Sequence, residues 1–178
     1  MTKLKPRFRT IALSLAIAPF VLVAACSTRP TQPPAPPAVR PTPTEVALSP
    51  ADYVREASSI SLFAIKASQL VAGRNVGVTS AARTIEQEQG VIAAQLSFAG
   101  RRVNLLPSAD ILPEHEAMLA TLDASADPAN LYREQMRIVL SRGASIHGAF
   151  ARGGASATLR PVAEMSVPIF QRELRLVR

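Results

Sequence analysis

Residues 49–73, SPADYVREASSISLFAIKASQLVAG, predict an amphipathic helix and thereby the fold class. Ser49 suits an N-cap, Pro50 the first helical position, and Asp52 lies three residues after the cap. Gly73, followed by Arg74, is a suitable end for this helix. Between these ends, apolar or small residues recur at alternating spacings of four and three: Tyr53, Ala57, Ile60, Ala64, Ala67 and Val71. That spacing is typical of one buried helix face.

The chain from there to residue 178 keeps the helical spacing and lacks the alternation that is typical of strands. We expect three further long helices, and one short helix that precedes the third long helix. For the second long helix, Asn75 is the predicted cap and Gly100 the predicted end, and Pro113 opens the short helix. The third long helix starts at Asp127-Pro128 and ends at Gly153-Gly154, and the last helix carries its apolar face from Leu159 onward. Pro168 lies inside the last helix and predicts a kink.

Four long amphipathic helices with mostly short connections predict an all-α fold over residues 50–178. The simplest arrangement is an antiparallel four-helix bundle with a short extra helix in the second connection. Small residues on the apolar faces would let the helices approach closely: Ala57, Ala64, Ala67, Ala82, Gly143 and Ala163.

The first 25 residues have the organisation of an export signal. Residues 1–9 are basic, and residues 10–25, TIALSLAIAPFVLVAA, are apolar and uncharged. A membrane-spanning helix needs roughly 20 apolar residues, and Pro19 interrupts this shorter stretch. The pattern therefore favours a cleaved signal peptide over a permanent span.

Cys26 is the only cysteine and follows Val23-Ala24-Ala25. These four residues resemble the bacterial lipobox, which implies cleavage before Cys26, a diacylglyceryl group on its thiol and an acylated new N-terminus. A disulfide within the chain is excluded because no second cysteine exists. A catalytic or buried structural thiol would need a scaffold that the following sequence does not offer. Ser27 in place of Asp favours, by resemblance to lipoprotein sorting signals, the outer membrane facing the periplasm.

Residues 26–49 predict a disordered tether. The stretch 27–50 contains eight of the chain's 15 prolines, a composition that favours extended polyproline II. At ~3.1 Å per residue such a tether could reach roughly 70 Å from a membrane. The alternative interpretation is a proline-rich ligand for a recognition domain.

The net charge of +7 does not predict a nucleic-acid partner. Four of the 20 basic residues lie within the first nine, so the chain after residue 25 has 16 basic and 13 acidic residues, or +3. That balance, without a basic stripe interleaved with aromatic residues, indicates solvated surfaces instead.

The order of helices and motifs resembles the exported bacterial family called domain of unknown function 4142. The segments that carry the resemblance are 82–89 (ARTIEQEQ), 113–115 (PEH), 131–133 (LYR) with Met136, 159–163 (LRPVA) and 168–174 (PIFQREL). The resemblance covers residue 50 to the end and implies a ferritin-like four-helix fold.

The chain departs from the family pattern where the family has polar residues. Glu88-Gln89 replaces Asp-His, and Ala144 and Glu173 occupy positions where a His is usual. Only His115 falls on a family His position. The resemblance therefore supplies no complete set of metal ligands.

The residues themselves do not match a known catalytic or metal-binding pattern. A carboxylate-bridged dimetal site needs Glu-x-x-His on two helices, and neither His115 nor His147 has Glu three residues earlier. Two histidines and an acylated thiol are also too few for a zinc site. We find no Ser-His-Asp set and no phosphate-binding glycine loop. We expect no cofactor and no enzymatic activity.

A few polar residues fall on or beside the apolar faces. Gln89 and Glu173 lie on them, so we expect these two to hydrogen-bond each other or Arg and Tyr side chains. Glu88 adjoins this face, and the three residues could instead form a residual polar site. His147 is expected to be a satisfied histidine in the core or at its boundary, and His115, in the first turn of the short helix, to be exposed.

The sequence thus predicts a lipid-anchored cell-envelope protein with a non-catalytic periplasmic helical domain. That domain would bind or scaffold an envelope protein partner. The first alternative is a metal-dependent or redox protein of ferritin type that uses Glu88, Glu173 and His147, with His115 as a further ligand. The second is a soluble cytoplasmic regulator, which the leader disfavours.

Overall fold

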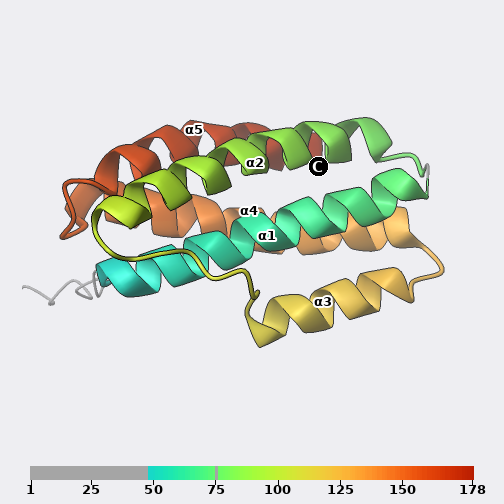
Figure 1. Cartoon of the computed structure of the whole chain (residues 1–178). Coiled ribbons are helices and arrows are strands. Elements are labelled where there is room, and N and C mark those ends of the chain that lie inside the picture. Colours follow the sequence, from blue (N-terminus) through green and yellow to red (C-terminus); the bar gives the residue numbers. More distant parts are fainter. Residues whose placement is uncertain (1–47, 75) are drawn as a thin grey trace, which may run out of the picture. The chain divides into compact units, whose positions relative to one another are not determined.

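The computed structural model describes residues 48–74 and 76–178, and within them the chain is entirely helical. The helices are α1 (Pro50–Gly73), α2 (Thr79–Arg102), α3 (Pro113–Asp123), α4 (Pro128–Gly153) and α5 (Arg160–Leu176) (Figure 1). The predicted all-α class, with four long helices and a short one, is confirmed for this part of the chain. The predictions for the signal peptide, Cys26 and the tether up to residue 47 lie outside the described residues.

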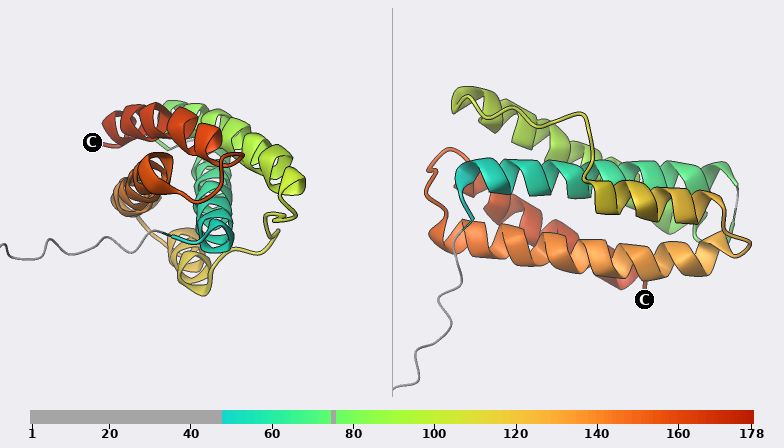
Figure 2. Two further views of the ribbon diagram at one scale, coloured as in Figure 1. Left: turned by 90° about the vertical axis from the view of Figure 1, so that its left-hand side faces the viewer. Right: turned by 90° about the horizontal axis from the view of Figure 1, so that it is seen from below.

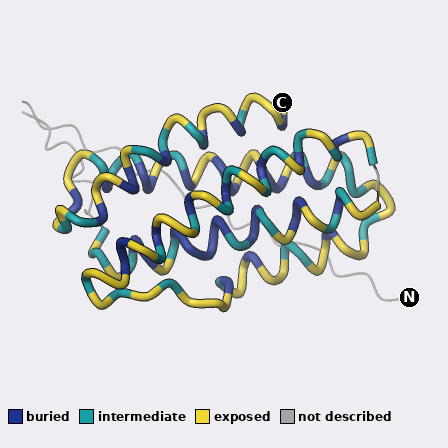
Figure 3. Tube along the Cα trace, turned by 45° about the horizontal axis from the view of Figure 1, so that its top comes forward, coloured by how far each residue is buried: buried dark blue, intermediate teal, exposed yellow. Residues whose placement is uncertain are grey.

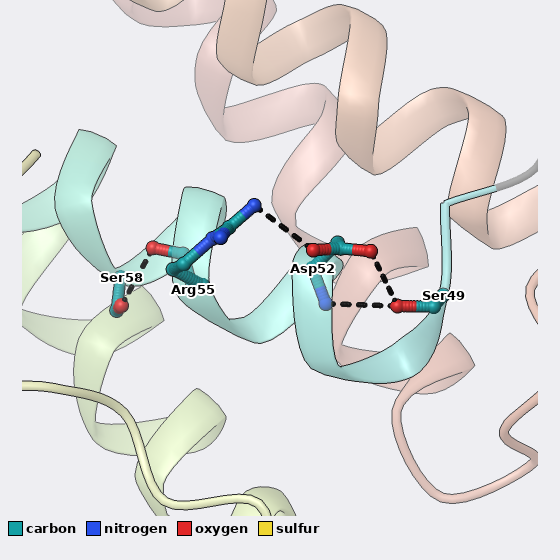
Figure 4. Close-up of polar contacts among 4 residues, drawn as sticks. All are labelled: Ser49, Asp52, Arg55 and Ser58. Carbon is teal, nitrogen blue, oxygen red and sulfur yellow. Dashed lines mark hydrogen bonds and ion pairs between the residues drawn. The ribbon is translucent and has the colours of Figure 1, made fainter.

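The start of α1 has the predicted cap. The Asp52 backbone N–H donates to Ser49 Oγ (3.1 Å), and Ser49 Oγ donates to Asp52 Oδ2 (2.6 Å) (Figure 4). Arg55 reaches back to the same carboxylate at 2.9 Å, and Ser58 Oγ donates to the Arg55 carbonyl oxygen. The Ser49 bond satisfies one of the backbone N–H groups that a helix start leaves free, and Pro50 at the first position has no N–H to satisfy.

The limits of α2 differ from those predicted. Asn75 lies outside the described residues, and the N-cap is Val78, which makes no side-chain capping bond. At the other end the helix continues past Gly100 to Arg102. The Gly100 carbonyl oxygen accepts the Leu105 N–H (2.9 Å), and a Cβ at Gly100 would lie 2.2 Å from the Leu105 carbonyl oxygen. Gly100 is therefore needed because the backbone at Leu105 packs directly against it, and it does not mark the end of α2.

The predicted limits of the later helices are confirmed. Pro113 begins α3, Asp127 caps α4 by accepting the Asn130 N–H at 3.3 Å, and α4 ends at Gly153. Pro168 lies inside α5. The kink predicted there stays a prediction.

The long helices pack side by side, with α1 against α2 and α4, and α5 against α4 and α2. The short α3 contacts only α1 and α4, on the side away from α2 and α5 (Figures 1 and 2). Buried residues form one side of each long helix and face the shared core (Figure 3). The six residues predicted at alternating spacing on α1 are all buried, and of the two residues that widen this face Phe63 is buried and Leu70 is partly buried. None of the described helices has the length and apolar character needed to cross a bilayer.

The small residues on the apolar faces are buried, as their role in close packing requires. Ala57, Ala64, Ala67, Ala82 and Ala163 are wholly enclosed. At Gly143 the ring of Phe170 from α5 comes so near α4 that a Cβ would lie 2.3 Å from the ring's Cε1 atom. The contact between α4 and α5 therefore depends on the absence of a side chain at this position.

Candidate functional site

The core contains a polar pair between α2 and α5. Gln89 and Glu173 are both 0% exposed, and Gln89 Nε2 donates to Glu173 Oε2 at 2.7 Å. The prediction that these two residues hydrogen-bond each other is confirmed. Such a bond offsets part of the cost of removing both groups from water.

Burial controls the charge of this pair. Removal from water, together with the nearby Glu88, raises the pKa of Glu173 to about 8, although the Gln89 hydrogen bond and Arg172 oppose the change. At pH 7 the Glu173 carboxyl is therefore mainly protonated and neutral. A neutral acid and an amide are compatible with an apolar surrounding, whereas an unpaired carboxylate is not.

Glu88 connects this pair to the surface. The Arg172 guanidinium donates to Glu88 Oε1 at 2.8 Å, in an ion pair that is partly open to solvent. Three buried oxygens around the pair have no hydrogen-bond partner among the described residues: Glu88 Oε2, Gln89 Oε1 and Glu173 Oε1. The cluster can therefore form further hydrogen bonds, as acceptor at Glu88 and Gln89 and as donor at the protonated Glu173.

A second polar contact lies within electrostatic range of the first. Ser68 of α1 and Tyr132 of α4 share a buried hydrogen bond of 2.8 Å. Burial raises the pKa of the Tyr132 phenol to about 12, and the Glu173 carboxyl contributes to that increase. Each of the four long helices thus places at least one polar side chain in the core.

His147 lies in the core, in agreement with its prediction. It is 0% exposed, its Nδ1 shares a hydrogen bond of 2.9 Å with the Tyr53 hydroxyl, and its ring lies 5.0 Å from that of Phe170. Its Nε2 has no partner among the described residues, so only one of the two ring nitrogens is satisfied. Burial lowers the pKa of His147 to about 3, which keeps the imidazole neutral.

The prediction that His115 is exposed is wrong. The residue is 7% exposed because α3 packs its first turn onto α1, where His115 Nδ1 lies 2.6 Å from Ser59 Oγ. The Leu112 backbone N–H also donates to Ser59 Oγ, at 2.7 Å. His115 therefore fastens the start of α3 to α1. Its seven-residue spacing from Leu122, the other buried residue of α3, was the available sequence signal.

Beside His115 lies a groove of about 400 Å³ between α1, α3 and α4, which the sequence interpretation missed. Its polar lining consists of His115, Glu114, Glu56 and Arg142, and the rest is apolar. The guanidinium of Arg142 forms an ion pair with Glu56. A mostly apolar cavity of this size with a few convergent polar groups has the features of a ligand-binding site.

The ligands of the alternative metal hypothesis are not brought together. Glu173 bonds Gln89, Glu88 bonds Arg172, His147 bonds Tyr53 and His115 bonds Ser59. Among the described residues no group of three or more His, Cys, Asp or Glu side chains is placed to hold a metal ion. The side chains present therefore do not fit a carboxylate-bridged dimetal centre.

Comparison with protein-family models, curated proteins and solved structures found no match to this chain. The lipobox at Cys26 and the resemblance to domain of unknown function 4142 consequently stay predictions.

Proposed function

We propose that this chain is a lipid-anchored cell-envelope protein whose helical domain binds or scaffolds a partner in the periplasm. In this proposal Cys26 bears the lipid, residues 27–49 form the tether and the domain from Pro50 onward is the binding body. The domain performs no catalysis. The lipid attaches it to a membrane, and Ser27 after the lipidated cysteine directs it to the outer membrane.

The observation that carries the proposal is the position of the sole cysteine. Cys26 directly follows the apolar stretch 10–25 and precedes the proline-rich stretch, and the first helix of the described residues begins at Pro50. An anchored thiol needs no scaffold, whereas a catalytic thiol does. Several acyl chains would give stable anchoring, because a single chain holds a protein only weakly.

We further propose that the domain has the antiparallel, ferritin-like four-helix topology. In its support, α1 contacts α2 and α4, and α5 contacts α4 and α2, so the long helices form a closed ring of neighbours. The short α3 lies outside this ring, in the connection between α2 and α4.

A non-catalytic binding role agrees with how the polar side chains are used. In the core, Gln89 bonds Glu173 and Tyr53 bonds His147, and both His147 and Glu173 are held in their neutral forms. The groove beside α3, in contrast, is open to solvent and includes charged side chains in its lining. A partner would therefore bind on the α1–α3–α4 side.

The anchor is tested by growing producing cells with labelled palmitate and measuring the mass of the mature chain. We expect label in the wild-type chain, cleavage before Cys26, and loss of both label and membrane attachment in Cys26→Ser. The control Ser27→Ala should remain labelled. An unlabelled wild-type chain that retains residues 1–25 would refute the proposal.

The metal or redox alternative has one observation in its favour, the unpartnered oxygens of Glu88, Gln89 and Glu173. Elemental analysis of protein purified without chelators separates the two hypotheses. Stoichiometric iron, manganese or zinc that is lost in Glu173→Ala would support the alternative. A chain without stoichiometric metal supports the binding role.

A further inference from the structure

The floor of the α1–α3–α4 groove is aliphatic. Ile60 and Val139 form buried parts of it, and Met118 from α3 is half-buried against them. Ile138, at 60% exposure, stands at the rim. Such walls favour a ligand with a short hydrocarbon segment, because its burial removes apolar surface from water.

The charges around the groove leave an excess of one negative charge. Glu56 and Arg142 form an ion pair and neutralise each other. Glu114 also lines the groove and forms no ion pair with any described side chain. Both carboxylates lie near enough to His115 to raise its pKa, against the lowering that burial causes. The uncompensated group is therefore an acid beside an aliphatic cavity.

His115 adds a hydrogen-bond donor without a positive charge. Ser59 Oγ already accepts the Leu112 N–H, so its own proton is free to be donated to His115 Nδ1. The neutral ring then carries its proton on Nε2, which has no hydrogen-bond partner among the described residues. His115 lines the cavity, so this N–H is available to donate to a carbonyl oxygen of a ligand there.

We propose that this groove binds a primary alkylammonium group, such as the side chain of lysine in a partner protein. The methylene chain lies on Ile60, Met118 and Val139, and the ammonium group lies beside Glu114. His115 Nε2–H donates to a carbonyl oxygen of the same ligand. The inference rests on the binding role proposed above and defines its ligand class.

Other ligand classes fit these residues less well. An anion would meet the Glu114 carboxylate without a free cation, since Arg142 is already paired with Glu56. A neutral hydrocarbon would remove water from the Glu114 carboxylate without supplying a hydrogen bond or an opposite charge. An ammonium group on an aliphatic chain can pair with the Glu114 carboxylate while its methylene groups pack against the apolar lining of the groove.

The test is calorimetric titration of the full-length chain in detergent with N-acetyl-lysine methylamide, hexylammonium, the neutral N-acetyl-norleucine methylamide and hexanoate. We expect the two cations to bind and the norleucine compound to bind about fivefold more weakly, which is the upper end of what the loss of one partly exposed ion pair implies. Tighter binding of the lysine derivative than of hexylammonium, which has no carbonyl oxygen for His115 Nε2–H, supports the proposal. Equal binding of hexylammonium would overturn the contact between His115 and the ligand.

Matched variants locate the site. Glu114→Gln should weaken binding of the lysine derivative about fivefold, whereas Glu116→Gln, an exposed acid of the same helix that does not line the groove, should leave it unchanged. Circular dichroism verifies that both variants fold. Absence of cation binding, equal binding of hexanoate, or equal effects of the two variants would overturn the proposal. Because the readout does not involve Cys26, such a failure leaves the lipid anchor untouched.

Discussion

Substitution of Glu173 by Gln should remove a pH-dependent cost from folding. The wild-type carboxyl is wholly buried, accepts one bond from Gln89 and has a pKa of about 8 against an ordinary value of 4.5. Glutamine has nearly the same shape and stays neutral at every pH. The Gln89 amide can turn to offer either its oxygen or its nitrogen, so the hydrogen bond can persist.

The direction of this pH dependence follows from which state, folded or unfolded, binds the Glu173 proton more tightly. Above pH 4.5 the unfolded chain loses the Glu173 proton while the folded chain keeps it, so stability falls as pH rises. The stabilising effect is fully present below pH 4.5 and is lost by the time pH passes about 8. At about 1.4 kcal/mol for each pH unit, the interval corresponds to about 5 kcal/mol. The variant should therefore gain about this much relative to wild type between pH 4.5 and pH 9.

The assay is urea unfolding of wild type and Glu173→Gln, followed by circular dichroism at several pH values from 4.5 to 9. The difference in unfolding free energy between the two chains at each pH removes the contribution of every other group that titrates in the same way in both chains. Glu164→Gln, an exposed acid on the same helix, is the control and should show no such trend. A difference between Glu173→Gln and wild type that stays constant within about 1 kcal/mol would refute the reasoning.

Further predictions concern the packing, the cap and the second ionisable core residue. Gly143→Ala should lower the urea midpoint strongly because the added Cβ would clash with Phe170. Gly90→Ala is the matched control, since no atom lies within 4 Å of the added Cβ, and it should raise stability by roughly 0.5–1 kcal/mol in the same assay. Ser49→Ala should cost about 1 kcal/mol in that assay through loss of the cap. For His147, whose pKa is about 3, stability is present above pH 6.5 and lost on acidification at about 1.4 kcal/mol per pH unit. His147→Gln should remove that loss when acid unfolding is followed by circular dichroism.

The helix limits that the sequence predicted correctly depend on local chemistry. Ser49 with Asp52, Pro113, and Asp127-Pro128 act within four residues of the helix they begin, so their pattern is visible in the sequence. The limits of α2 depend on tertiary contacts instead. Gly100 resembles a helix end, yet it is required because the chain near Leu105 passes against it.

The same distinction applies to the polar residues. Gln89 and Glu173 could be paired in advance because both interrupt apolar faces at helical spacing, and two polar groups in one core require partners. The burial of His115 could not be deduced in this way. It depends on where α3 docks, and its partner Ser59 lies 56 residues earlier on another helix. The groove follows from that docking and was missed with it.

The charge states of the core bear on the choice between a binding protein and a metal protein. Glu173 and His147 are ionisable groups in the core between the long helices, and burial favours the neutral form of each. A bound cation would require Glu173 to ionise, against the desolvation that raises its pKa, and the side chains around it do not supply a second buried carboxylate free of an Arg partner. The groove beside α3 has the opposite character, because Glu114 is exposed and lacks an ion-pair partner among the described residues. If the proposed binding role holds, we therefore expect the cationic ligand to be an organic ammonium group in the groove and not a metal ion in the core.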